Sequence, residues 1–327
     1  MNAIWEKRGL AAMLLLPVAF LFSLLVCSRR YAYRVGVLRC VKMRVPVVVV
    51  GNIAAGGAGK TPTVLALVQE LAARGRRPGI VSRGYGGSFL GVHDVEVDDS
   101  AEVVGDEPLL LKRRAGCPVF VGSDRVLAAQ ALLAAFPECD VIVSDDGLQH
   151  YALARDVEIA VIDRRMLLNH WMQPAGPFRE PARRLAQVDA VVKNGAVDIM
   201  VSGVPTFDMQ LTGARFVALD DPSQVCAAAA FNGQRLHAVA GIGEPQRFFD
   251  HLAGLGLVCE THEFPDHHRY AAADLDFGGD AILATEKDAV KLRGLSRLPV
   301  WVLPVDAQIS PDLATFVLEK LDGHPSA

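Results

Sequence analysis

The sequence lacks the features of several protein classes. None of its six cysteines belongs to a Cys-x-x-Cys pair, so neither a zinc site nor a disulfide framework is indicated, and scattered thiols fit a reducing cytosolic compartment. Neither sign of charge dominates, with 33 Lys and Arg against 37 Asp and Glu, so no bulk positive charge is available to hold nucleic acid. No internal repeat or low-complexity tract is present. The 327 residues, 51% of them apolar, suffice for one large or two modest domains with buried cores.

A long apolar run near the N-terminus departs from this soluble composition. Residues 9–27 contain no charged side chain and are about long enough to cross a bilayer at roughly 1.5 Å per residue, so we expect residues 1–28 to form a membrane helix. A cleaved signal peptide fits less well, because the run is long and an Ala-x-Ala cleavage site is missing. A buried amphipathic helix also fits less well, because the run is apolar on every face. Pro17 leaves a kinked, half-embedded or interfacial helix open.

Basic residues flank this run unequally. Two precede it and six follow it, and this excess on the C-terminal side predicts that the bulk of the protein lies in the cytosol. The same residues can lie against anionic lipid headgroups, or they can serve only as a topology signal. The eight residues are Lys7, Arg8, Arg29, Arg30, Arg34, Arg39, Lys42 and Arg44.

Beyond residue 44, short apolar runs alternate with helical patterns. In the first set we expect strands over residues 47–50, 78–82, 118–121, 141–144, 157–162 and 188–193, and helices over 61–74, 107–114 and 125–136. In the second set we expect strands over 236–240, 281–285 and 300–304, and helices over 244–255 and 311–321. The segment 195–219 has weaker periodicity and is a candidate hinge. The pattern predicts an α/β fold with a P-loop-like, mostly parallel sheet over residues 29–200, and a smaller α/β lobe over 201–327 that closes a ligand cleft.

The segment Gly51-Asn-Ile-Ala-Ala-Gly-Gly-Ala-Gly-Lys-Thr-Pro62 follows the first predicted strand. The usual phosphate-binding loop reads Gly-x-x-x-x-Gly-Lys-Ser/Thr, and this chain departs from it only at the first position, which holds Ala54. Small residues let backbone N–H groups turn toward phosphate oxygens, and the N-terminus of the next helix attracts anions. We therefore expect Lys60 to reach the outer phosphates of a nucleotide and the Thr61 hydroxyl to hold Mg²⁺. The expected backbone donors are Gly56, Gly57, Ala58 and Gly59.

Two carboxylates, Asp145 and Asp146, end the strand expected over residues 141–144. Nucleotide sites of this kind place an acidic residue at the end of a nearby strand, where it holds Mg²⁺ directly or through water. The alternative is that both residues only open a turn before Gly147. The phosphate-binding loop upstream favours the metal interpretation.

Four further polar clusters lie at expected strand or helix ends. They read Ser-Arg-Gly-Tyr-Gly-Gly over 82–87, Gly-Asp-Glu-Pro over 105–108, Gly-Pro-Phe-Arg-Glu-Pro over 176–181 and Phe-Pro-Asp-His-His over 264–268. Each alone is explained by a helix cap, a rigid turn, a surface ion pair or a hydrogen-bonded histidine. Their order along the chain, together with the Gly-Lys-Thr loop and Ser-Asp-Asp-Gly-Leu-Gln-His, resembles one family, the tetraacyldisaccharide 4′-kinases, over nearly the whole chain.

This resemblance implies a reaction. The enzyme would transfer the γ-phosphoryl group of ATP, with Mg²⁺, to the 4′-hydroxyl of a tetraacylated glucosamine disaccharide 1-phosphate, which forms lipid IVA in lipid A biosynthesis. It further implies a protein that binds this lipid, and no nucleic acid, at the cytosolic face of the inner membrane. We expect a monomer. A membrane helix would confine enzyme and lipid to one surface and so raise their effective concentration.

The resemblance also implies roles at matched positions. Asp106 would be the catalytic base, paired across the cleft with His267, and Arg179 and Lys60 would stabilise charge on the transferring group. His268 is an alternative to His267, because one sequence does not settle the alignment. The implied metal set is Thr61, Glu107, Asp145 and Asp146, and further residues expected to line the site are Arg83, Tyr85, Gln149 and His150.

Two other functions fit some of these features. A membrane-tethered nucleotide hydrolase that acts as a switch would use the same Gly-Lys-Thr loop and Asp145, but the sequence has no Asn-Lys-x-Asp motif to read a guanine base. A kinase would consume nucleotide faster when the lipid disaccharide is added. A soluble phosphate-binding α/β protein would keep its N-terminus as a core helix and would leave membranes with salt alone.

Overall fold

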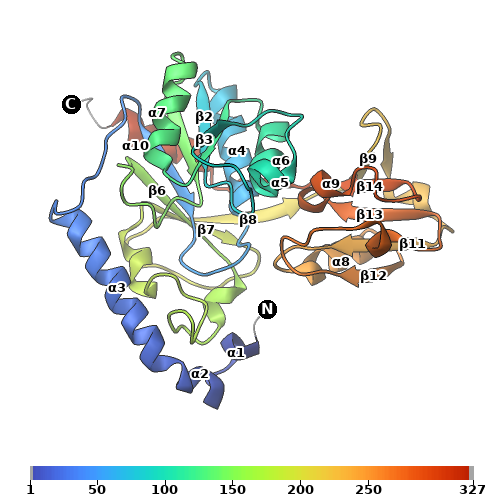
Figure 1. Cartoon of the computed structure of the whole chain (residues 1–327), viewed down its shortest axis with the longest axis horizontal. Coiled ribbons are helices and arrows are strands. Elements are labelled where there is room, and N and C mark those ends of the chain that lie inside the picture. Colours follow the sequence, from blue (N-terminus) through green and yellow to red (C-terminus); the bar gives the residue numbers. More distant parts are fainter. Residues whose placement is uncertain (1–2, 324–327) are drawn as a thin grey trace.

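A computed structural model describes residues 3–323, which fold into two sheets placed side by side (Figure 1). The larger sheet consists of β1 (Val47–Gly51), β2 (Pro78–Ser82), β3 (Val92–Asp94), β4 (Val119–Gly122), β5 (Val141–Asp145), β6 (Val157–Ile162), β7 (Ala190–Asn194), β8 (Thr206–Thr212) and β15 (Asp306–Ser310). Its order is β15-β8-β7-β6-β1-β5-β2-β4-β3, and only the edge strands β15 and β3 pair antiparallel. A mostly parallel sheet was predicted and is confirmed.

The smaller sheet has the order β10-β9-β14-β13-β11-β12. Its strands are β9 (Arg215–Ala218), β10 (Val225–Ala227), β11 (Leu236–Ala240), β12 (Cys259–Glu263), β13 (Ala281–Thr285) and β14 (Val300–Leu303). The strands β14, β13, β11 and β12 pair parallel to one another. Strand β9 pairs antiparallel with β14 on one side and with β10 on the other. Helices α8 (Pro245–Gly254) and α9 (Glu286–Leu292) follow β11 and β13, with short 3₁₀ turns at Ala228–Phe231 and Ala272–Leu275.

Helices cover both faces of the larger sheet, which explains why its central strands are mostly apolar and almost wholly buried. Val48 and Val50 of β1 pack in a core with α4 (Lys60–Ala73), α6 (Asp106–Ala115) and α10 (Leu313–Asp322). Val47 and Val49 face the opposite core, which includes α7 (Arg125–Ala135). The remaining short elements of this lobe are α5 (Ala101–Val104) and two 3₁₀ turns, Arg164–Leu167 and Ala182–Gln187.

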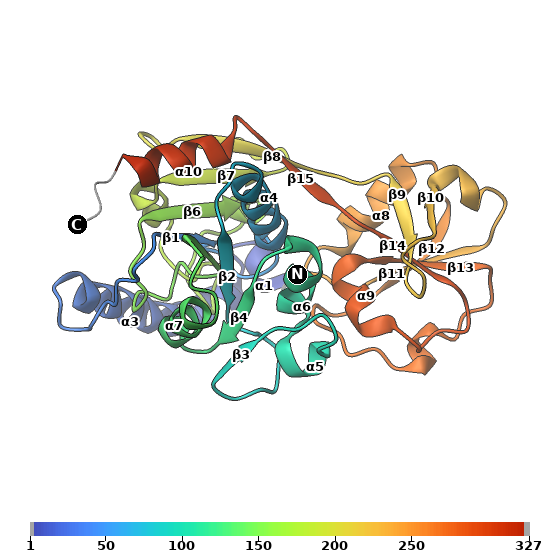
Figure 2. The same ribbon diagram turned by 90° about the horizontal axis from the view of Figure 1, so that it is seen from above.

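Two adjacent segments connect the lobes. The chain leaves the larger sheet after β8 and returns to it through β15, and these two strands pair with each other (Figure 2). Where the segments cross, a Cβ added to Gly213 would lie 2.3 Å from the Pro304 carbonyl oxygen. The two lobes are therefore not separated by a single boundary at residue 200, because β8, β15 and α10 follow that residue and belong to the larger lobe.

The membrane helix expected over residues 1–28 is not one continuous helix in the structure. In residues 3–323, no helix combines the length and apolar character that crossing a membrane requires. The apolar run is divided between α2 (Leu10–Leu14) and α3 (Leu16–Arg34), with Pro17 in the first turn of α3, and a short helix, α1 (Ala3–Glu6), precedes them. The second half of α3 carries Arg29, Arg30 and Arg34, so its 19 residues join an apolar half to a basic half.

Helix α3 lies along one side of the larger lobe (Figure 1). Arg29 Nη1 donates to the Gln149 carbonyl oxygen at 3.3 Å, and the rings of Tyr33 and Tyr151 lie 6.0 Å apart. Ala12 and Ala19 are buried, but many large apolar side chains of α2 and α3 face outward. These exposed residues are Leu10, Met13, Leu14, Leu16, Val18, Phe20, Leu21, Leu24 and Leu25.

Candidate active site

Three neighbouring strands bring the predicted motifs together. β5 lies between β1 and β2, and all three are parallel, so their carboxyl ends meet at one edge of the sheet. The Gly-Lys-Thr loop follows β1, Asp145 and Asp146 lie at the end of β5, and Ser82 ends β2. This edge faces the smaller lobe, and ligands of open α/β sheets bind at such an edge.

The loop over residues 52–59 is shaped by two glycines and held by two buried side chains. Gly56 and Gly59 have φ of 103° and 94°, which other residues rarely adopt. The Arg165 guanidinium donates to the Ala55 and Gly57 carbonyl oxygens at 3.2 and 2.5 Å, and the Asn194 amide donates to the Ala58 carbonyl oxygen at 2.9 Å. With these carbonyls turned away and bonded, the loop has a fixed conformation before any ligand binds.

Lys60 is the first residue of α4 and is almost buried, with 7% of its side chain exposed. Its ammonium lies 3.7 Å from Asp146 Oδ1 and 3.4 Å from the Gly56 carbonyl oxygen. Arg179 also binds Asp146, at 3.1 and 3.2 Å. Burial alone would raise the pKa of Asp146, but Lys60 and Arg179 outweigh it and lower that pKa. Two cations thus converge on one carboxylate at the sheet edge.

Asp145 differs from its neighbour. It is fully buried, Ser82 Oγ donates to its Oδ2 at 3.1 Å, and its Oδ1 has no hydrogen-bond partner among the described residues. Burial, with the nearby charges of Glu107 and Asp146, raises the pKa of Asp145 to about 7. An unpartnered buried carboxylate oxygen is costly, and it needs an explanation.

Asp106 and His267 come from different lobes and are in contact. His267 Nδ1 lies 2.9 and 3.0 Å from the two oxygens of Asp106, and Lys287 Nζ lies 3.2 Å from His267 Nε2. Because a lysine ammonium can only donate, this network assigns the proton of a neutral imidazole to Nδ1. Burial would raise the pKa of Asp106, but the bond from His267 and the charge of Lys287 lower it to about 2. Asp106 is therefore ionised at neutral pH.

His268 is not the partner of Asp106. Its Nε2 lies 3.1 Å from Asp274 Oδ2, within its own lobe. Tyr85 packs edge-on against the His267 ring, with centroids 5.1 Å apart. Of the other candidates, Arg83, Tyr85 and Gln149 line the cleft, whereas His150 does not.

Two cavities lie on either side of the Gly-Lys-Thr loop. The larger, of about 750 Å³, reaches from Phe22, Leu25 and Val26 of α3 to the loop and the carboxylates. The smaller, of about 290 Å³, lies between the lobes, and Thr61 lines only this one. Gly57, Lys60 and Glu107 line both cavities. His267 lines the larger cavity, whereas Asp106 is 5% exposed and lines a third cavity, of about 240 Å³, which His267 also lines.

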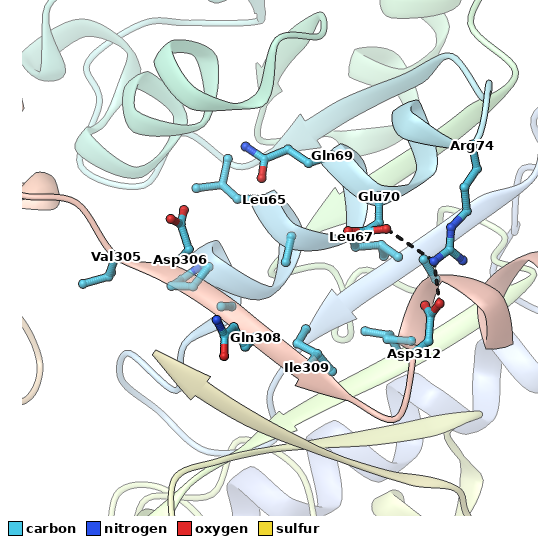
Figure 3. A pocket seen from close by; sticks show the side chains of 15 residues that line it. Leu65, Leu67, Gln69, Glu70, Arg74, Val305, Asp306, Gln308, Ile309 and Asp312 are labelled. Carbon is cyan, nitrogen blue, oxygen red and sulfur yellow. Dashed lines mark hydrogen bonds and ion pairs between the residues drawn. The ribbon is translucent and has the colours of Figure 1, made fainter. Parts of the chain in front are cut away.

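A further hollow, of about 410 Å³, lies outside this cleft, between α4 and β15 (Figure 3). Arg74 there binds Glu70 at 3.3 Å and also pairs with Asp312. Arg74 thus neutralises two of the carboxylates that line this hollow. None of the predicted site residues lines the hollow.

Several residues of the cleft were missed in the sequence. Lys287 binds Glu107 at 3.1 Å and Asp266 at 3.0 Å, and Arg247 of α8 donates to Asn194 at 2.8 Å. Arg165 is buried beside Asp163 and holds the loop. The only sequence signal for Lys287 is its position just after the apolar strand β13, where it reads Thr-Glu-Lys-Asp. Arg165 and Arg247 have no comparable signal, because the loop carbonyls and Asn194 that they bind are far away in the sequence.

The fold and the cleft define an α/β protein that gathers cations, carboxylates and a glycine-rich loop where its two lobes meet. The profile of the tetraacyldisaccharide-1-P 4'-kinase family matches residues 11–322. A tetraacyldisaccharide 4'-kinase from Azoarcus sp. (strain BH72) is 54% identical over 327 residues, covering 99% of this chain and 96% of that protein. One from Aromatoleum aromaticum is 52% identical over 332 residues, with 99% and 98% coverage.

A solved structure agrees with these relatives. The crystal structure of LpxK from Aquifex aeolicus in complex with ATP matches with a TM-score of 0.82 and 29% identity, over 95% of this chain and 100% of that one. The chain therefore belongs to the tetraacyldisaccharide-1-P 4'-kinase family, and it is a kinase. The resemblance seen in the sequence is confirmed, and the nucleotide switch is not supported.

Proposed function

We propose that this kinase transfers the γ-phosphoryl group of ATP to the 4′-hydroxyl of tetraacyldisaccharide 1-phosphate. The observation that carries the proposal is the pair of cavities that share Gly57, Lys60 and Glu107. A group transfer between two substrates needs both to reach one point, and these three residues form the wall between the two spaces. The family to which the chain belongs, and the ATP in the related crystal structure, support the choice of substrates.

The larger cavity suits the acceptor. A lipid-linked sugar needs an apolar wall for its acyl chains and polar groups for its head, and this cavity has both. Phe22, Leu25 and Val26 form the apolar wall, and Arg29 lies beside them on the same helix. The 4′-hydroxyl would lie at the opposite end, near His267 and the Gly-Lys-Thr loop.

The smaller cavity suits the nucleoside. Its lining is rich in apolar side chains from both lobes, among them Leu65, Leu110, Ile242 and Phe248. A planar base fits an apolar space, while the triphosphate would extend along the loop toward Lys60. We assign phosphate binding to the backbone of residues 56–59 with Lys60 and Thr61. This is the role of a P-loop, and Ala54 in place of the usual first glycine does not prevent it.

Charge stabilisation falls to Lys60 and Arg179. Phosphoryl transfer has a loose transition state, so positioning and positive charge contribute more than covalent chemistry. Both cations now bind Asp146, which keeps them at the sheet edge until the phosphates arrive. Arg83 and Tyr85 would line the acceptor side.

The carboxylates fit Mg²⁺. The donors are all oxygens, as this ion prefers, and Asp145 Oδ1 is buried without a partner. Mg²⁺ usually takes one or two carboxylates and completes its shell with water and substrate phosphates. The residues that would hold it are Thr61, Glu107, Asp145 and Asp146, and the ion would neutralise charge on the phosphate oxygens.

The Asp106–His267 pair is proposed as the base. A carboxylate with a pKa of about 2 is a weak proton acceptor alone, but Asp106 is in contact with His267 Nδ1 at 2.9 Å. His267 faces the acceptor cavity, so a substrate hydroxyl that takes the place of Lys287 at Nε2 can pass its proton to that nitrogen while Asp106 stabilises the resulting charge. Asp106 thus supplies the negative charge that makes the pair basic.

A membrane surface is the proposed location, on the cytosolic side of the inner membrane, and a single chain supplies every group of the site. The nine outward apolar side chains of α2 and α3 form a band beside the mouth of the acceptor cavity, and basic residues follow them. Such a helix can lie in the headgroup region without spanning the bilayer. The lipid could then enter the cavity from the membrane.

The test is transfer of label. The full chain is incubated with γ-labelled ATP, Mg²⁺ and the lipid disaccharide 1-phosphate in detergent micelles, and label is followed on lipid and on free phosphate. We expect label on the lipid at the 4′ position, and none with a disaccharide whose 4′-hydroxyl is blocked. Release of free phosphate at a rate independent of the lipid would instead indicate a hydrolase.

A further inference from the structure

A cluster of three side chains lies on the smaller sheet, outside the catalytic cleft. His237 is on β11, and Glu260 and His262 are on its neighbour β12. His237 Nδ1 lies 2.9 Å from His262 Nε2 and 3.7 Å from Glu260 Oε2, and His262 Nε2 lies 3.9 Å from Glu260 Oε1. Among the residues the structure describes, it is the one group of three His, Cys, Asp or Glu ligand atoms that converge within 4.8 Å.

The strand register places all three on one face. His237 pairs with Glu260, and His262 lies two residues further along β12, so the period of two gives these side chains the same direction. The ring of Phe277 stacks on both imidazoles, with centroids 4.7 and 4.0 Å away. This packing fixes the planes of the two rings before any ion binds.

The tautomer of His237 is also fixed. Its Nε2 donates to the Gly278 carbonyl oxygen at 2.8 Å, which leaves a lone pair on Nδ1, the atom that faces the other two ligands. Metal-bound histidines almost always carry such a bond on the second nitrogen. Gly279 is required beside this contact, because a Cβ there would lie 2.9 Å from His237 Nε2.

We infer that His237, Glu260 and His262 form a site for a divalent transition ion of the zinc class. Two imidazole nitrogens and one carboxylate oxygen are a zinc ligand set that leaves the fourth tetrahedral position to water. Bonds of about 2.0–2.1 Å require ligand atoms roughly 3.3 Å apart. Here the imidazole nitrogens lie 2.9 Å apart, and the two Glu260 oxygens lie 3.7 Å from His237 Nδ1 and 3.9 Å from His262 Nε2. Side-chain rotations that shift the ligand atoms by a few tenths of an ångström would complete the tetrahedral geometry. Glu260 is 71% exposed, which gives the ion access from solvent.

The site would fasten the edge strand β12 to β11. This pairing matters for the cleft, because β12 ends four residues before His267, and Phe264 donates its N–H to the Ala240 carbonyl oxygen at 2.9 Å. Zinc bound there would stabilise the lobe, because an ion that binds the folded state and not the unfolded state favours folding. Its ligands are distinct from those proposed for Mg²⁺, so the inference does not depend on the proposed function.

A titration of the chelator-treated full chain with ZnCl₂, in excess Mg²⁺, tests the site. We expect one tight zinc per chain by calorimetry, a higher unfolding temperature with zinc, and at least tenfold weaker binding in Glu260→Gln and His262→Gln. The control is His268→Gln, which removes a histidine of the same lobe that binds Asp274, and it should leave zinc affinity unchanged.

Cobalt identifies the ligands. The Co²⁺ form should show visible bands of a tetrahedral nitrogen and oxygen site that disappear in His262→Gln. An absence of tight zinc binding, zinc affinity unaffected by Glu260→Gln and His262→Gln, or a near-ultraviolet thiolate band that places the ion on a cysteine would each overturn the inference.

Discussion

His267 Nδ1 lies 2.9 Å from Asp106 Oδ1, although 161 residues separate them and they belong to different lobes. Because the two residues act as one unit, the losses of activity caused by substituting each of them should not be additive. We expect Asp106→Asn and His267→Gln each to lower kcat by roughly 10²- to 10⁴-fold, with the double variant close to the worse single one. ATP binding should be retained.

The measurement is steady-state transfer to lipid for the four proteins of this cycle, with nucleotide binding followed separately. His268→Gln is the control, since its imidazole binds Asp274 and should change kcat by less than about twofold. Full activity in Asp106→Asn, or two losses that simply multiply, would show that the pair is not the base.

Lys60 is expected to act on the phosphates. Lys60→Ala removes a buried cation that lies 3.7 Å from Asp146 and should lower kcat/KM for ATP by roughly 10²-fold or more. The matched control is Lys320→Ala, which removes an exposed lysine bound to Asp189. Both variants are compared by initial rates of ADP release in the presence of lipid, and an unchanged rate in Lys60→Ala would remove the phosphate-binding role from the loop.

The loop conformation is predicted to be as necessary as its lysine. In Gly56→Ala the new Cβ would lie 2.0 Å from Arg165 Nη1, at a backbone φ of 103°. Gly36→Ala has a similar strain, with φ of 78°, but its Cβ would meet no atom within 4 Å. Gly36→Ala should lose about 1 kcal/mol of stability and Gly56→Ala more, because of the added clash, and only Gly56→Ala should lose nucleotide affinity, measured by calorimetry. Equal affinity in the two variants would contradict the assigned loop.

The apolar wall of the larger cavity predicts a selective defect. Phe22→Ser and Leu25→Ser should raise KM for the lipid severalfold and leave KM for ATP unchanged, because the nucleoside is assigned to the other cavity. Leu90→Ser is the control, since this leucine is 96% exposed and lines neither cavity. A parallel rise in KM for ATP would place the lipid elsewhere.

His150 predicts a pH dependence of stability. Burial first, and then the charge of Arg125, lower the pKa of His150 to about 4, below the unfolded value of about 6.5. The unfolded chain thus binds more protons between these values, so stability is fully present above about pH 6.5 and is lost as pH falls toward 4. Between pH 7 and 5 the loss should be on the order of 1–2 kcal/mol. Denaturant unfolding at both values measures it, and His150→Gln should have a smaller loss than the wild type.

The parallel core was predictable because it is local. The residues of β1, β2, β5 and β6 are mostly apolar, and the predicted ranges agree with the observed strands within one residue. The strands β3, β8, β9, β10, β12 and β15 were missed. They lie at or near sheet edges, where one face meets solvent and polar residues interrupt the pattern, as in the alternating burial of β15.

The division of the N-terminal apolar run into two helices has a local cause. The length of an apolar run shows how much hydrophobic surface a helix there would have, but not where that helix is interrupted. Here a break at Leu15 divides the run into α2 and α3. Within the site, glycines, Lys60 and the Asp pair were visible as motifs. Arg165, Lys287 and Arg247 were not, because each acquires its role from contacts between elements that only folding brings together.

The central claim is that one loop presents phosphate to two cavities, and a structure with a non-hydrolysable ATP analogue tests it most directly. The account predicts the β- and γ-phosphates against the backbone of residues 56–61, within reach of Lys60 Nζ, with the nucleoside in the cavity between the lobes. A triphosphate bound away from Lys60, with this loop free of ligand, would contradict it.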